Sequence, residues 1–117
     1  MDLLVISNHP PEIWNEAQKK LWDNIEYIPF PNVSPDSTIY DVSIIGEELI
    51  KQIKATKITV LNIQGEYSLF SYLFAKLFCQ EHYTFAFPST ERIVEQKKDN
   101  KKLVTFKFKQ WRVLTSA

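Results

Sequence analysis

The stretch KITVLNIQGEYSLFSYLF, residues 57–74, decides the predicted fold. Residues 58–63 are rich in β-branched side chains and are typical of a buried strand. After Gln64 and Gly65 the chain continues as an apolar segment with helical potential. A buried strand that runs directly into a helix is the repeating unit of a parallel α/β sheet. Gly65 is one of only two glycines in the chain, so its place at this junction needs an explanation.

The same alternation of strand and helix continues on both sides of this stretch. We expect strands at 3–6, 25–30, 57–63 and 83–87, and helices at 11–22, 39–56 and 66 or 67 to 81. The first helix is expected to bury one face, and Pro88 is expected to end the fourth strand. That face consists of Ile13, Trp14, Ala17 and Leu21.

The C-terminal part changes character, because apolar residues alternate with threonine or lysine at positions 104–109. A period of two is typical of an antiparallel strand, so residues 91–114 are predicted to form a hairpin with Asp99 and Asn100 at its tip. The chain is therefore predicted to be one domain, residues 1–117, of α/β class. Its Rossmann-like parallel sheet is covered by helices and carries a C-terminal antiparallel β-hairpin.

Composition limits the function classes. Fourteen basic and fourteen acidic residues give a net charge of zero, which argues against binding of duplex nucleic acid through a general basic surface. The single cysteine, Cys79, cannot form an internal disulfide or a cysteine-rich metal site, and it is predicted to be buried. No apolar run reaches the ~20 residues of a membrane span, and no signal peptide is visible. We expect a cytoplasmic protein without membrane association, metal or cofactor.

Three polar clusters follow predicted strands. Because ligands of open parallel sheets bind beyond the carboxyl ends of the strands, these clusters are predicted to form one site. They are Ser7-Asn8-His9, Gln64-Gly65-Glu66 and Ser89-Thr90-Glu91-Arg92.

Gly65 has two possible roles. It either lets a phosphate or ribose approach the main chain, with the first amides of the following helix directed at the ligand, or it only forms a tight turn. Plainer explanations also exist for its neighbours in the site. His9 is either catalytic or a solvated loop residue, Glu66 either contacts ligand or caps the helix, and Arg92 either contacts ligand or pairs with a surface carboxylate.

The predicted third helix is apolar on nearly all sides, with leucine or phenylalanine at positions 69, 70, 73, 74, 77 and 78. A small domain usually leaves one helix face in water, so we expect a homodimer through this helix. The alternative is that the C-terminal hairpin covers the same face.

Four segments in order carry a family resemblance: ISNHPPE, IQGEYSLFSYLF, FPSTERIVEQ and FKFKQWR. Together they resemble the small CRISPR-associated ring nucleases of type III systems, of the Csx type with a CARF-like core. The resemblance extends over most of the chain and is best from 58 to 112. Tyr67 stands where the family usually has a small residue, and Gln110 where it often has histidine.

The resemblance implies a homodimer that binds cyclic tetra-adenylate across its two-fold axis and cleaves it without metal, which switches off antiviral signalling. A ribose 2′-hydroxyl would attack the adjacent phosphorus. His9 would move the proton, and Arg92 and Arg112 would stabilise charge. The implied ligand-binding residues are Ser7, Asn8, Gln64, Gly65, Glu66, Tyr67, Ser68, Ser89, Thr90 and Glu91.

Three other functions remain open. The same site could bind a cyclic oligoadenylate as a sensor or sequestering protein without cutting it. The domain could be a nucleotide-binding or scaffold domain with no affinity for such ligands. It could also bind RNA through the lysines of 97–102 and the aromatic residues of the last strand.

Overall fold

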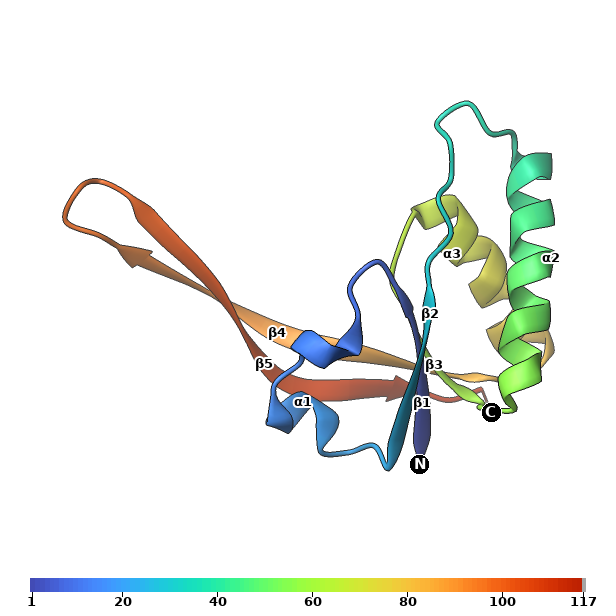
Figure 1. The fold of residues 1–117 in the computed structure, drawn as a ribbon, viewed down its shortest axis with the longest axis horizontal. Helices are drawn as coiled ribbons and strands as arrows, with labels where there is room; N and C mark the ends of the chain where they lie inside the picture. Colours follow the sequence, from blue (N-terminus) through green and yellow to red (C-terminus); the bar gives the residue numbers. More distant parts are fainter. Residues whose placement is uncertain (117) are drawn as a thin grey trace.

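A five-stranded sheet with the strand order β2-β1-β3-β4-β5 forms the centre of the molecule (Figure 1). The computed structural model describes residues 1–116. The first four strands in this order pair in parallel, and β5 pairs with β4 in antiparallel orientation. This arrangement confirms the predicted α/β fold with its C-terminal antiparallel hairpin. The strands are β1 (Asp2–Ser7), β2 (Asn24–Pro29), β3 (Val60–Ile63), β4 (Thr84–Gln96) and β5 (Lys102–Leu114).

Two helices cover one face of the sheet. They are α2 (Ile39–Thr56) and α3 (Tyr67–Phe74), and α3 continues directly into a π-helical segment, η2 (Ala75–Gln80). The side chain of Thr38 and the Asp41 carboxylate form a capping box that starts α2. The buried core between helices and sheet includes Leu4, Ile6, Leu49, Ile53, Leu61, Leu69, Leu73, Leu77 and Phe85.

The apolar character of α3 and η2 is largely satisfied within one chain. Leu69, Leu73 and Leu77 are completely buried. The second row, Phe70, Phe74 and Phe78, is half-buried and packs on β4 with its rings stacked on one another. The structure therefore accounts for the leucine row of the surface that led us to predict a dimer through 69–78, and it leaves the outer edge of the phenylalanine row partly exposed.

The other face is covered by a short irregular segment, which corrects the prediction of one helix over 11–22. The segment contains a 3-10 turn, η1 (Pro11–Ile13), and a single helical turn, α1 (Glu16–Lys19). Between them the chain is extended at Trp14, and the Asn15 side chain accepts the amide of Gln18 and so starts a new turn. A side-chain cap of this kind competes with a continuous helix.

Tryptophan packing determines how this segment sits on the sheet. Trp14 and Trp22 pack against Trp111 of β5, with ring centroids 5.4 and 5.3 Å from it. The indole N–H of Trp111 donates to the carbonyl oxygen of Gln18 at 2.9 Å. Ile13 and Leu21, which we predicted to be buried, are exposed instead.

The fourth strand does not end at Pro88. β4 continues to Gln96, while its parallel neighbour β3 ends at Ile63. Val60 lies beside Thr84, and this register brings the end of β3 level with Phe87. One edge of β4 is therefore unpaired at Pro88, where a missing N–H costs no ladder hydrogen bond. The fourth strand was expected to begin at Tyr83, whereas β4 begins one residue later, at Thr84.

Beyond this point β4 and β5 project from the body as a long two-stranded ribbon (Figure 1). A register shift between Ser89 and Thr90 marks its base, and we call residues 90–109 the arm. At its tip Asn100 adopts a left-handed conformation, as the predicted turn requires.

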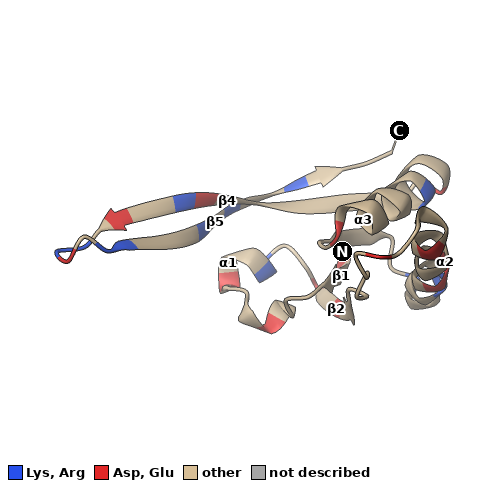
Figure 2. Cartoon of the chain, turned by 90° about the horizontal axis from the view of Figure 1, so that it is seen from above, with Lys and Arg blue, Asp and Glu red and all other residues tan. Residues whose placement is uncertain are grey.

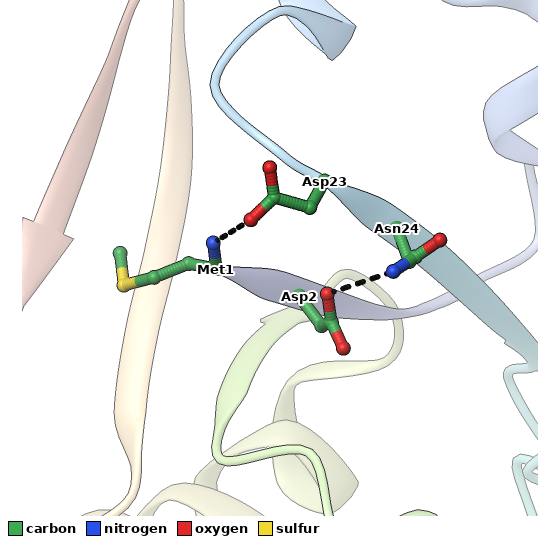
Figure 3. A network of polar contacts seen from close by, with 4 residues as sticks. All are labelled: Met1, Asp2, Asp23 and Asn24. Carbon is green, nitrogen blue, oxygen red and sulfur yellow. Dashed lines mark hydrogen bonds and ion pairs between the residues drawn. The ribbon is translucent and has the colours of Figure 1, made fainter.

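Two polar contacts join β1 to β2 at the amino ends of the strands (Figure 3). The amino group of Met1 forms an ion pair with Asp23, and the Asn24 amide donates to the Asp2 carboxylate at 3.2 Å. These contacts lie at the edge of the sheet opposite the predicted site.

Two further observations concern single features of the chain. Cys79 is exposed, which corrects the prediction that it is buried, because it lies on the outer side of η2 while Leu77 faces the core.

Within residues 1–116 no helix is long and apolar enough to cross a membrane.

Candidate functional site at the carboxyl ends of β1 and β3

Two of the three predicted polar clusters meet in one cleft. Ser7, Asn8 and His9 line it from the end of β1, and Gln64 and Gly65 line it from the end of β3. The cleft has a volume of about 210 Å³.

The cleft lies where the chain changes direction across the sheet. β1 is followed by β2 on one side and, after α2 has crossed back, by β3 on the other. Such a switch point between neighbouring parallel strands is where open α/β sheets bind ligands. A larger hollow of about 410 Å³, lined among others by Trp22 and Asp23, lies instead near the amino ends of the strands. We therefore regard the smaller cleft as the candidate site.

Hydrogen bonds fix the loop that follows β1. Ser7 is buried, and its hydroxyl oxygen accepts the amide of His9 at 3.1 Å. Its carbonyl oxygen accepts the Tyr27 hydroxyl at 2.7 Å and the amide of Phe30 at 3.1 Å. Asn8 and His9 are exposed, so their side chains are available to a ligand while their main chain is held in place.

Gln64 is oriented by a residue that the sequence analysis missed. Asn62 is completely buried in β3, where its amide nitrogen donates to the carbonyl oxygen of Ala86 at 2.9 Å. Its amide oxygen accepts from the Gln64 side chain at 3.0 Å. The signal was visible in the sequence, because an asparagine inside a run of buried aliphatic residues must satisfy its amide locally.

The structure gives Gly65 a packing role. A Cβ placed on Gly65 would lie 2.4 Å from the ring of Phe30, a residue of the buried core. The backbone of Gly65 is not in a left-handed conformation. Glycine is needed at this position because the Phe30 ring occupies the space where a side chain would begin, whichever ligand the cleft binds.

The start of α3 is not free to bind a phosphate. The carboxylate of Glu66 accepts the amides of Ser68 and Leu69 at 3.0 and 2.9 Å, and the Ser68 hydroxyl also donates to it. These hydrogen bonds, led by the one from the Ser68 hydroxyl, lower the pKa of the Glu66 carboxyl. The capping role considered for Glu66 is therefore present, and it occupies the amides of Ser68 and Leu69, which we predicted to point at a ligand. Tyr67 is 86 % exposed beside the cap.

The third predicted cluster is not a loop. Ser89, Thr90, Glu91 and Arg92 belong to the continuous strand β4, because Pro88 does not end it. Glu91 forms an ion pair with Lys109 across the ribbon. These four residues therefore do not join the other two clusters at the cleft.

The two predicted catalytic arginines lie on opposite faces of the β4–β5 ribbon. Arg92 pairs with Phe106, and Arg112 pairs with Phe87. Arg92 and Phe87 are five positions apart on β4, so their side chains point to opposite faces. Neither arginine lines the cleft that contains His9.

A comparison with models of protein families identifies the family of this chain. The model of one family matches residues 1–112. The chain belongs to the Uncharacterized protein MJ1673 family. This match covers all strands except the last residues of β5 and includes every residue that lines the cleft. The match to the MJ1673 family therefore covers nearly the whole fold described above and is not limited to one segment of it.

No curated protein and no solved structure matches the chain. Among residues 1–116, no three histidine, cysteine or acidic side chains gather closely enough to hold a metal ion.

Proposed function

We propose that this member of the MJ1673 family binds a cyclic oligoadenylate, cyclic tetra-adenylate, at the cleft between β1 and β3 and cleaves the ring. The observation that supports binding is the position of the cleft at the switch point of the sheet, with amide and imidazole side chains at its edge. The choice of ligand and of reaction rests on the resemblance to type III CRISPR ring nucleases.

The size of the cleft supports a symmetric arrangement. A volume of about 210 Å³ is smaller than the roughly 300–1,000 Å³ of sites that enclose a whole small molecule. One copy would therefore hold only part of a four-nucleotide ring. A homodimer that presents the cleft twice suits a ligand with repeated units.

The proposed reaction needs few protein groups. The ribose 2′-hydroxyl loses its proton and attacks the adjacent phosphorus, the bond between phosphorus and the 5′-oxygen breaks, and the 5′-oxygen takes up a proton. The products are linear and end in a 2′,3′-cyclic phosphate. His9 is the one histidine of the cleft lining, and an imidazole can both accept and donate a proton, so it receives the role of acid and base. Asn8 and Gln64 would hold the ribose in line for attack, a contribution worth several kcal/mol.

Incubation with cyclic tetra-adenylate tests this proposal. The purified protein should convert the ring to linear products resolved by chromatography, and His9→Ala should lose cleavage by at least ~100-fold while it keeps binding. The matched control is His82→Ala, because His82 is the other histidine of the chain, lies outside the cleft lining and forms a ring hydrogen bond with Ser116. A wild-type protein that leaves the ring intact would rule out the nuclease.

A second candidate function is binding without cleavage. The positions of Arg92 and Arg112 favour it, because neither arginine stands beside His9 to stabilise a transition state. In that case calorimetry would show tight binding, lost in Gln64→Ala, with no product after prolonged incubation. A protein that neither binds nor cleaves cyclic oligoadenylates would rule out both functions and leave a different α/β ligand-binding or scaffold role.

A further inference from the structure

The zero net charge of the chain conceals two regions of opposite sign. The arm, residues 90–109, contains seven lysines or arginines and three acidic residues. The rest of the chain contains seven basic and eleven acidic residues. Figure 2 marks the positions of lysine and arginine in blue, and they occur at the tip and along the β4–β5 ribbon, whereas several acidic positions, in red, lie on α2. The arm thus carries a net charge of +4 and the body a net charge of −4.

The arm also exposes an apolar strip. Val94 pairs with Val104 on the face of the ribbon that carries Phe106. All three side chains are exposed, and Phe106 is 67 % exposed. Near the body the same face is covered, because Phe108 packs against Trp111, which lies under the α1 segment. One face of the ribbon is therefore covered near the body, at Phe108, and exposed farther out, at Phe106.

The body contains a surface that complements the arm. Residues 21–50 contain six acidic residues and no lysine or arginine. Within this stretch, Ile39, Tyr40 and Ile44 in the first half of α2 are exposed, and Tyr40 is 71 % exposed. Asp36 and Glu48 lie beside them in the sequence and are also exposed. We call this surface the α2 seat; it combines exposed apolar side chains with negative charge.

An arm cannot reach the α2 seat of its own chain, because the tip of the arm and α2 lie at opposite ends of the long axis (Figure 1). We propose that the arm of each chain docks on the α2 seat of a second copy, with the valines and Phe106 on its apolar side chains and the tip lysines near its carboxylates. A two-fold arrangement uses both arms and both seats and closes the assembly. Two arms packed on each other would instead bring like charges together.

The second copy fits the arm better than RNA does. Aliphatic valines offer no flat surface on which a base can stack, although Phe106 does. The negative charge of the body would also repel a polyanion that follows the ribbon inward. The proposal concerns the protein without nucleotide and does not rest on the proposed function.

Sedimentation equilibrium without nucleotide, with charge-reversed variants, tests the docking. We expect a dimer for the wild type. We expect at least a ~10-fold weaker dimer for a tip variant in which Lys97, Lys98, Lys101 and Lys102 become glutamate, which corresponds to about 1.4 kcal/mol. A seat variant with Asp36→Lys and Glu48→Lys should be weakened in the same way. An equimolar mixture of the two variants should associate again. In the mixed dimer the negative arm of the tip variant faces the positive seat of the seat variant, and the other arm and seat are both native and complementary.

Two controls make the result specific. Phe106→Ser should weaken the dimer. At a concentration where wild type and variant are both monomeric, it should leave the melting temperature unchanged, because Phe106 is exposed in the single chain. Ser71→Arg on the exposed side of α3 should leave the dimer intact, whereas a dimer through residues 69–78 would dissociate. The proposal is overturned by a monomeric wild type, by a dimer that the tip variant does not weaken, or by a monomer that binds single-stranded RNA through the tip lysines.

Discussion

Gly65→Ala tests whether Gly65 is required by packing or by a ligand. The new methyl carbon would lie 2.4 Å from the Phe30 ring, about 1 Å closer than the ~3.5 Å at which carbon atoms make favourable contact. Phe30 is 5 % exposed and its amide donates to the carbonyl oxygen of Ser7. Its ring therefore cannot move away without disturbing both the core and the loop that holds His9.

Overpacking of this kind costs about 1–3 kcal/mol. We therefore expect Gly65→Ala to reduce the free energy of unfolding by ~2 kcal/mol, which lowers the melting temperature by roughly 8 °C for a domain of this size. Urea denaturation of the ligand-free protein measures the change. A smaller side chain at position 30 should relieve the clash, so Gly65→Ala should cost less in a Phe30→Leu background than in the wild type.

Two results would refute the packing argument. If Gly65→Ala left the ligand-free protein as stable as the wild type, the Phe30 ring would not be the reason for glycine at this position. Equal costs in the wild type and in the Phe30→Leu background would show that the two residues are not coupled. In the first case a loss of ligand affinity alone would favour the role we first considered, close approach of a ligand to the main chain.

Three further predictions concern groups that hold the site and the tryptophan cluster in place. Asn62→Ala should cost about 1–3 kcal/mol in urea denaturation, because it leaves the buried carbonyl oxygen of Ala86 without its donor. Trp111→Phe should destabilise the fold by about 1 kcal/mol more than Trp22→Phe, since the indole N–H of Trp111 makes a hydrogen bond and that of Trp22 has no partner. Glu66→Ala should lower stability at neutral pH, and unfolding measured from pH 7 downward should show the difference vanish in acid. The hydrogen bonds lower the carboxyl pKa from its ordinary value near 4.5, so their stabilisation is present above 4.5 and is lost as pH falls through the lowered value.

The elements that the sequence predicted well are those in which local pattern and tertiary environment agree. The fully apolar run at 3–6 and residues 60–63 of the β-branched run before Gln64 lie in the central strands β1 and β3, and all of these residues are buried. α2 has its predicted bounds because a capping box starts it at Thr38 and a long amphipathic pattern carries it to Thr56. The hairpin has its predicted tip because a turn with Asn100 in a left-handed conformation precedes the alternating residues 104–109 of β5.

The errors arose where a contact distant in sequence overrides a local rule. Ile13 and Leu21 have the spacing of a buried helix face, yet both are exposed. Trp14 and Trp22 pack against Trp111, about ninety positions further along the chain, and this packing determines which side of the segment faces the sheet. Pro88 looks like the end of a strand, but β3 has already ended beside it, so one edge of β4 needs no N–H there while β5 continues to pair with the other. Because β4 continues past Pro88, residues 89–92 extend along the ribbon and do not form the third loop of the predicted site.

The composition of the cleft restricts how a polyanionic ring can be bound. None of the five residues that line the cleft is a lysine or arginine, and the Glu66 carboxylate occupies the helix N-terminus next to it. The lining therefore offers hydrogen bonds to a ribose or a base, whereas it offers no cation to a phosphate. Phosphates of a bound ring would face outward, towards solvent or towards a second copy. The arm carries most of the uncompensated positive charge of the molecule, so charge neutralisation of such a ligand depends on where the partner's arm docks. Taken together, the two proposals predict that binding of the ring and association of two chains are coupled, so that each strengthens the other by the same factor.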